Sequence, residues 1–179
     1  MFGSKHTRYA ITAVALLGLA ACNSAPAATP TVGWADTDRP LTPHGRLQAR
    51  ELGGFLAGAG VELVLCSTAL RTRETAEHLG LKTPIRYVPG LYNCEATRIA
   101  FELARLPEYL TRVLVIGHAP AIPALARDLS DNLSDPAAVR LISRRCPPAT
   151  LCELEFSGLW SDLHSARLAA VHLPSLSLE

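Results

Sequence analysis

Hydrophobic positions along this chain follow two spacings, one typical of helices and one typical of strands. Segments of the two kinds alternate along the chain. From Arg46 to Gly58 the apolar residues recur at roughly helical intervals, and the pattern stops at a pair of nearby glycines. The run from Val61 to Ser67 that follows is short and mostly apolar, which is typical of a buried strand. This part of the chain is therefore predicted to form a helix and then a strand.

The same alternation continues towards the C-terminus. Helical patterns cover Ala69–Gly80, Ala96–Tyr109 and 121–130, and strand patterns cover Val113–Ile116, Thr150–Phe156 and 167–174, with a short strand and turn within 84–92. Strands that alternate with helices predict the α/β class, with a mostly parallel sheet covered on both faces. Ligands of such sheets bind at the carboxyl ends of the strands. We therefore expect Ser67, Arg71, Gly117 and His118 to meet at one edge.

The first thirty residues allow two interpretations. Basic residues precede an apolar stretch, Tyr9–Ala21, which is shorter than the roughly 20 residues of a membrane-spanning helix and is typical of a secretory signal. Its end, Leu19–Cys22, resembles the lipobox of bacterial lipoproteins, which implies cleavage before Cys22 and a lipid anchor on that thiol. The other interpretation is a buried strand, because short apolar runs of both kinds look alike.

Composition restricts the classes of function. Of the 179 residues, 49% are hydrophobic and 18% are charged, as in a globular domain. We expect residues 31–179 to form that domain, and residues 1–30 to be a signal-like or aberrant segment with a linker. A net charge of +1 argues against non-specific nucleic-acid binding. No two of the five cysteines have the spacing of a metal or redox motif, so no metal site is expected.

Two arginines and one histidine follow predicted strands or lie in a loop that could face them: Arg39, Arg71 and His118. Guanidinium groups bind phosphate oxygens bidentately and remain charged at any working pH. Fixed cations also lower the barrier to phosphoryl transfer, because charge spreads over the phosphoryl oxygens. A histidine with an ordinary pKa near ~6.5 can hold or donate a proton. The three residues indicate a phosphate-binding site, with His118 as a candidate catalytic residue.

Three segments in this order, DRPLTPHGRLQA, VLCSTALRTRETAE and VLVIGHAPAI, resemble the histidine phosphatase (phosphoglycerate mutase-like) superfamily. The most similar branch is the short phosphohistidine phosphatases of the SixA type, and the resemblance runs from about residue 34 to 174. It implies a three-layer sandwich, hydrolysis through a phosphohistidine intermediate, and no metal or organic cofactor. The implied substrate is a phosphorylated protein or a small phosphomonoester. Residue matching carries over Arg39, Arg71 and His118 as phosphate-pocket residues, and Ser67 as a structural one.

The defining motif of that family is missing. It is Arg-His-Gly or Arg-His-Ala after the first strand, and its histidine is the nucleophile. It should fall near residues 23–27, where the sequence reads NSAPA, and the only upstream histidine is His6. We expect the segment Ala15–Cys22 to fill the place of the missing central strand, with the tail after Cys22 where the catalytic loop belongs.

Three explanations of the missing motif remain open. The chain could be an exported, lipid-anchored pseudophosphatase that binds phosphorylated ligands. Its N-terminus could instead result from a wrong start or a frameshift, in which case the natural protein would be an active cytoplasmic phosphatase. Lastly, it could be an active phosphatase that uses another nucleophile, since covalent catalysis requires one.

Overall fold

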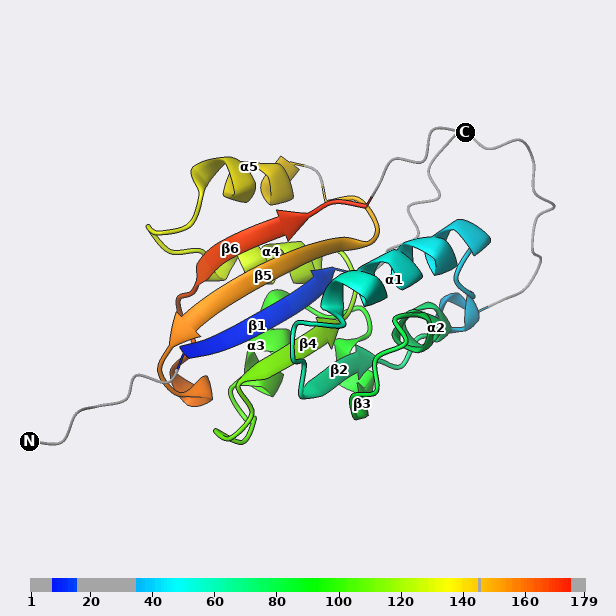
Figure 1. Cartoon of the computed structure of the whole chain (residues 1–179), viewed down its shortest axis with the longest axis horizontal. Helices are drawn as coiled ribbons and strands as arrows, with labels where there is room; N and C mark the ends of the chain where they lie inside the picture. Colours follow the sequence, from blue (N-terminus) through cyan, green and yellow to red (C-terminus); the bar gives the residue numbers. More distant parts are fainter. Residues whose placement is uncertain (1–7, 16–34, 145, 175–179) are drawn as a thin grey trace, which may run out of the picture.

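A single six-stranded sheet forms the centre of the molecule (Figure 1). The computed structural model describes residues 8–15, 35–144 and 146–174. The strands lie in the order β3-β2-β4-β1-β5-β6. Their bounds are β1 Arg8–Ala15, β2 Leu63–Ser67, β3 Ile85–Val88, β4 Arg112–Ile116, β5 Thr150–Ser157 and β6 Arg167–His172.

The sheet is mostly parallel, as the alternating pattern predicts. The pairs β3–β2, β2–β4 and β4–β1 are all parallel, whereas β5 runs antiparallel to both β1 and β6. The hairpin-like return through β5 and β6 therefore adds an antiparallel edge to a parallel sheet. The predicted α/β class with a mostly parallel sheet is confirmed.

A strand does occupy the central position, although it starts earlier than expected. β1 lies between β4 and β5, with Val14 paired to Ile116 on one side and to Leu151 on the other. It consists of Arg8–Ala15, the first half of the apolar run, so the expected span Ala15–Cys22 is wrong in its boundaries. The rest of that segment, including the lipidation candidate Cys22, lies outside the described residues, as do His6 and the tail after Cys22.

Five helices of eight residues or more accompany the sheet within the described ranges: α1 Pro43–Leu56, α2 Leu70–His78, α3 Ala96–Leu103, α4 Ala121–Leu129 and α5 Pro136–Arg144. Short 3-10 turns lie at η1 Asp36–Asp38, η2 Pro89–Leu91 and η3 Trp160–Asp162. Helix α3 ends at Leu103, earlier than its apolar pattern predicts. Helix α5 was not predicted, although its apolar residues recur at helical spacing and Ile142 is its one buried residue. No helix in the described ranges has both the length and the apolar character needed to cross a membrane.

The strand residues alternate between two apolar cores, one on each face of the sheet. Leu114 and Ile116 of β4 pack with residues of α1 and α2, whereas Val113 and Val115 pack with residues of α3 and α4. Figure 1 shows α1 in front of the sheet and α3 and α4 behind it. The three layers follow from the two-residue period of a strand that is buried on both faces.

Helices α1 and α2 approach each other closely at one glycine. A Cβ atom built on Gly53 would collide with the backbone carbonyl of Leu79 at the end of α2. The next residue, Gly54, has open space at the same position. Gly53 therefore sets the distance between these two helices, and α2 carries one of the candidate phosphate-binding arginines.

Candidate functional site

The candidate site lies at the carboxyl ends of two neighbouring parallel strands. Ser67 is the last residue of β2, and His118 follows the end of β4 by two residues. Arg71 is the second residue of α2, the helix that follows β2. Because β2 and β4 are paired and parallel, their carboxyl ends bring these three side chains together.

Arg71 is the most buried cation of the site, with only 6% of its surface exposed. Its Nη1 donates to the backbone oxygen of Asp36 at 2.7 Å, and its Nη2 donates to Asp36 Oδ2 at 3.1 Å. Nη2 also lies 3.3 Å from Nδ1 of His118. The buried Nε has no hydrogen-bond acceptor among the described residues. One N–H of a buried guanidinium is thus left without a protein partner, and buried polar groups rarely are.

His118 is buried and is held by a contact at each ring nitrogen. Nε2 lies 2.8 Å from Ser67 Oγ, and Nδ1 faces the Arg71 guanidinium. Since a guanidinium can only donate, Nδ1 accepts, and in the neutral ring the proton is on Nε2 and is donated to Ser67. Burial, together with the positive charge of Arg71, lowers the pKa of His118 to about 4. The imidazole is therefore neutral near pH 7.

The carboxylate of Asp36 connects three donors at the mouth of the site. Oδ1 accepts from Nη1 of Arg39 at 3.1 Å, and Oδ2 accepts from Arg71 and from the Tyr92 hydroxyl, the latter at 2.8 Å. The hydrogen bond from Tyr92, with support from the two arginines, holds the pKa of Asp36 below its usual value. Half of the Asp36 side chain is exposed, so the carboxylate is within reach of solvent.

Glu74 of α2 anchors the loop that carries Asp36 and Arg39. Its Oε2 accepts from the backbone N–H of Leu41 at 2.6 Å, and its Oε1 pairs with Arg46 at 3.4 Å. Helix α1 starts just beyond, where the Thr42 hydroxyl accepts from the N–H of Gly45 at 3.0 Å, an N-cap contact. The loop is therefore tied to the same helix that carries Arg71.

Tyr92 closes the side of the site next to β3. Its ring meets the His118 ring edge-on at a centroid distance of 5.6 Å, and the Arg71 guanidinium carbon is 5.8 Å from its centroid. Its hydroxyl donates to Asp36. Tyr92 thus contacts an imidazole, a guanidinium and a carboxylate of the site.

The structure brings together the three residues expected to bind phosphate. Arg39 and Arg71 bind opposite oxygens of one carboxylate, and Arg71 contacts His118. The sequence analysis did not single out Asp36 or Tyr92, which the structure places at this site. The position of Asp36 three residues before Arg39 was the available signal. Within the described ranges no cluster of three or more histidine, cysteine or acidic side chains could hold a metal ion.

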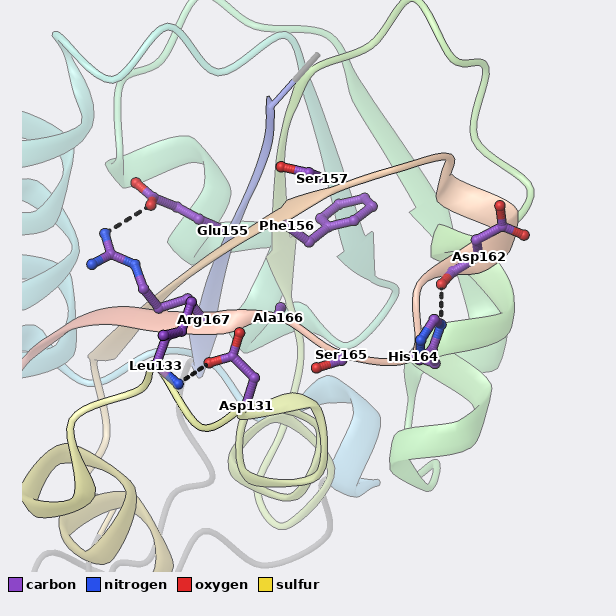
Figure 2. Close-up of a pocket in the computed structure, with 10 residues that line it drawn as sticks. All are labelled: Asp131, Leu133, Glu155, Phe156, Ser157, Asp162, His164, Ser165, Ala166 and Arg167. Atoms are coloured by element: carbon purple, nitrogen blue, oxygen red, sulfur yellow. Dashed lines mark hydrogen bonds and ion pairs between the residues drawn. The ribbon is translucent and has the colours of Figure 1, made fainter. Parts of the chain in front are cut away.

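A hollow lies at the opposite edge of the sheet. It is a cavity of about 630 Å³ between the end of β5, the start of β6 and the loop after α4. Figure 2 shows that its polar side chains bind near neighbours: Glu155 pairs with Arg167, Asp131 accepts from the backbone of Leu133, and His164 contacts the backbone of Asp162. Its residues are far from the arginine–histidine cluster, because β5 runs antiparallel to β1.

Known proteins resemble this chain over most of its length. An uncharacterized protein of Mycobacterium leprae is 36% identical over 144 residues, which cover 78% of this chain and 89% of that protein. The phosphohistidine phosphatase SixA of Escherichia coli is 32% identical over 109 residues, 56% of this chain and 68% of that protein. A solved structure from Nakamurella multipartitia, assigned as a SixA phosphohistidine phosphatase, is 33% identical with a TM-score of 0.77. The match covers 94% of this chain and 97% of that chain.

The sequence profile of the histidine phosphatase superfamily (branch 1) matches residues 28–100, the part that contains Arg39, Arg71 and Asp36. The order of strands, the position of the site at their carboxyl ends and the similarity to SixA proteins agree with this match. The chain belongs to the histidine phosphatase superfamily.

Proposed function

We propose that this site binds the phosphoryl group of a phosphohistidine protein or of a small phosphomonoester, as in a SixA-type phosphatase. The observation that carries the proposal is the buried Arg71, with the Arg39 guanidinium and the His118 imidazole beside it. A tetrahedral oxyanion offers several acceptors at once to such converging donors. The SixA relatives carry the name phosphohistidine phosphatase, which supports this class of substrate.

Each residue then has a definite part in holding the phosphoryl group. Arg71 supplies a permanent charge from a site with little water, where electrostatic attraction is stronger than at the surface. Arg39 is more exposed and can approach from the open side. Before binding, the His118 imidazole is neutral and Nδ1 carries no proton. A nearby dianion favours protonation of the imidazole, so that Nδ1 can become a donor.

We expect the chain as written to bind phosphate without efficient turnover. In a covalent mechanism a nucleophile must attack phosphorus, and histidine is the one that the family resemblance implies. His118 is the histidine at this site within the described residues, and both of its nitrogens are engaged, one with Arg71 and one with Ser67. It is therefore positioned as a binding group and not as the nucleophile.

The position of β1 bears on the lipoprotein alternative. Cleavage before Cys22 would remove Arg8–Ala15, the strand between β4 and β5. The backbone groups of both neighbours would lose their partners in the middle of the sheet, at a large cost in stability. This argues that residues 8–15 remain with the folded domain, and we do not favour the lipid-anchored form.

The proposal is tested with orthovanadate, inorganic phosphate and p-nitrophenyl phosphate on three proteins: the full chain, Arg71→Ala and Arg73→Ala. Arg73 lies on the same helix, is exposed and stacks on Tyr87, so its removal is the matched control. We expect calorimetric oxyanion binding by the full chain and by Arg73→Ala, a loss of at least about tenfold for Arg71→Ala, and no measurable turnover by any of them. Equal affinities for all three, or no oxyanion binding, would contradict the proposed site.

A further inference from the structure

Asp36 presents a carboxylate to the same donors that a phosphoryl group would need. Nη1 of Arg71 donates to the backbone oxygen of Asp36, and one N–H of Nη2 donates to Oδ2 of the Asp36 carboxylate. Arg39 donates to Oδ1 of the same carboxylate. Tyr92 donates its hydroxyl to the same Oδ2. Two guanidinium groups and one phenol thus converge on a single negative charge that belongs to the chain itself.

This carboxylate is an anion near neutral pH. Tyr92 and the two arginines stabilise its charged form, which keeps the pKa of Asp36 below its usual value. The charge is held by a short turn, η1, whose residues Asp36–Asp38 are all exposed. The side chain can therefore leave the arginines without disrupting a core.

We propose that the Asp36 carboxylate is a built-in competitor, which occupies the Arg39 and Arg71 donors and which a phosphoryl group must displace. This inference rests on the proposed function of the site. A tethered carboxylate is present at high effective concentration, so a free monocarboxylate gains little by replacing it. A phosphoryl dianion brings a second negative charge and more acceptor oxygens than a carboxylate, so it gains more from the two guanidinium groups. The competitor thus selects dianionic tetrahedral ligands over weaker anions.

Removing the charge while keeping the shape tests this directly. In Asp36→Asn the backbone oxygen that binds Nη1 of Arg71 is unchanged, and the amide oxygen can still accept from Tyr92. We expect roughly tenfold tighter binding of inorganic phosphate, because one negative charge a few ångströms from the ligand is removed. Binding of acetate should become detectable. Asp36→Ala, which removes all side-chain contacts, should show the same direction.

Asp38→Asn is the matched control, since it removes one charge from the same exposed turn and Asp38 bonds to Thr37. Phosphate affinity is measured by calorimetry for the full chain, both Asp36 variants, Asp38→Asn and Arg71→Ala. Tighter binding by the Asp36 variants alone supports the inference. If they bind phosphate equally or more weakly while Arg71→Ala still loses binding, Asp36 positions Arg71, and only the competitor is refuted. Absence of phosphate binding in every protein overturns this inference and the proposed function together.

Discussion

Arg71 faces Nδ1 of His118 across 3.3 Å, and this contact decides which nitrogen of the imidazole carries its proton. The guanidinium can only donate, so Nδ1 accepts and Nε2 donates to Ser67 Oγ at 2.8 Å. Burial, together with the cation that is expected to bind phosphate, keeps the His118 imidazole neutral. The charge state of the site therefore depends on Arg71 and His118 together.

His118 makes the stability of the protein depend on pH. Its folded-state pKa of about 4 lies below the ordinary value of 6.5, so the unfolded chain binds a proton between these values and the folded protein does not. The free energy of unfolding should fall by about 2 kcal/mol from about pH 7 to about pH 5 through this residue.

Urea unfolding at both pH values checks this, with His118→Gln as the test and the exposed His44→Gln as the control. His118→Gln should lose most of the additional pH dependence, and His44→Gln should keep it. An unchanged pH dependence in His118→Gln would refute the assigned neutral state.

Ser67 supports the imidazole from the other side. Ser67→Ala leaves the buried Nε2–H of His118 without its acceptor, at a cost of about 1–3 kcal/mol in the free energy of unfolding. The neighbouring Thr68 is exposed, and Thr68→Ala should cost little. Denaturant unfolding of the two variants gives the comparison, and equal costs would mean that the Ser67 hydroxyl does not hold the ring.

Two adjacent glycines of α1 should respond in opposite directions. In Gly53→Ala the new methyl group meets the backbone of Leu79, which cannot yield as a side chain can, so we expect a loss of roughly 1–3 kcal/mol. Gly54 has open space, and Gly54→Ala should gain up to about 1 kcal/mol from helix propensity. Thermal unfolding measures both. Equal effects would contradict the close contact between α1 and α2.

The central strand β1 can be tested through its backbone. Thr12 pairs with Leu114 of β4 and with Glu153 of β5. Thr12→Pro removes a backbone N–H in the middle of the sheet and should cost about 3 kcal/mol or more. Thr12→Val keeps the N–H and a β-branched side chain, so it should fold normally. If circular dichroism shows equally stable Thr12→Pro and Thr12→Val proteins, residues 8–15 are not part of the sheet.

The gene can decide whether the missing nucleophile motif is hidden by a frameshift. Ala20-Ala21-Cys22 can be encoded by GCG GCA TGC, and a shift of a single nucleotide turns this into CGG CAT GC, which reads Arg, His and the start of an alanine codon. The motif would then be encoded at positions 20–22, just before residues 23–27, where the family spacing puts it. We expect sequencing of the gene to find Arg-His-Ala in this shifted frame. If neither alternative frame encodes it, the N-terminus is as written.

Restoring the motif gives a functional version of the same test. A chain in which residues 20–22 read Arg-His-Ala, made as Ala20→Arg, Ala21→His and Cys22→Ala, supplies the histidine that covalent catalysis requires. Turnover of p-nitrophenyl phosphate should appear in this variant and disappear again when Arg71→Ala is added. Failure of the triple variant to turn over substrate would argue that further upstream residues are also altered.

The amino-acid sequence by itself determined the alternation of strands and helices and the polar residues that follow the strands. Apolar runs such as Val113–Ile116 and periodic segments such as 121–130 predict their elements because side chains near one another in the chain share a face. The positions of Ser67, Arg71 and His118 after such elements predict their meeting at one edge, which the structure has.

Only the tertiary structure decided how these groups satisfy one another. Asp36 and Arg71 are 35 positions apart, and Tyr92 reaches the same carboxylate from 56 positions away, so no local spacing encodes their contact. The proton position on His118 likewise depends on which donors and acceptors converge on it. Periodicity reports which residues face the core, whereas hydrogen bonding and charge depend on distances between segments that meet only when the chain has folded.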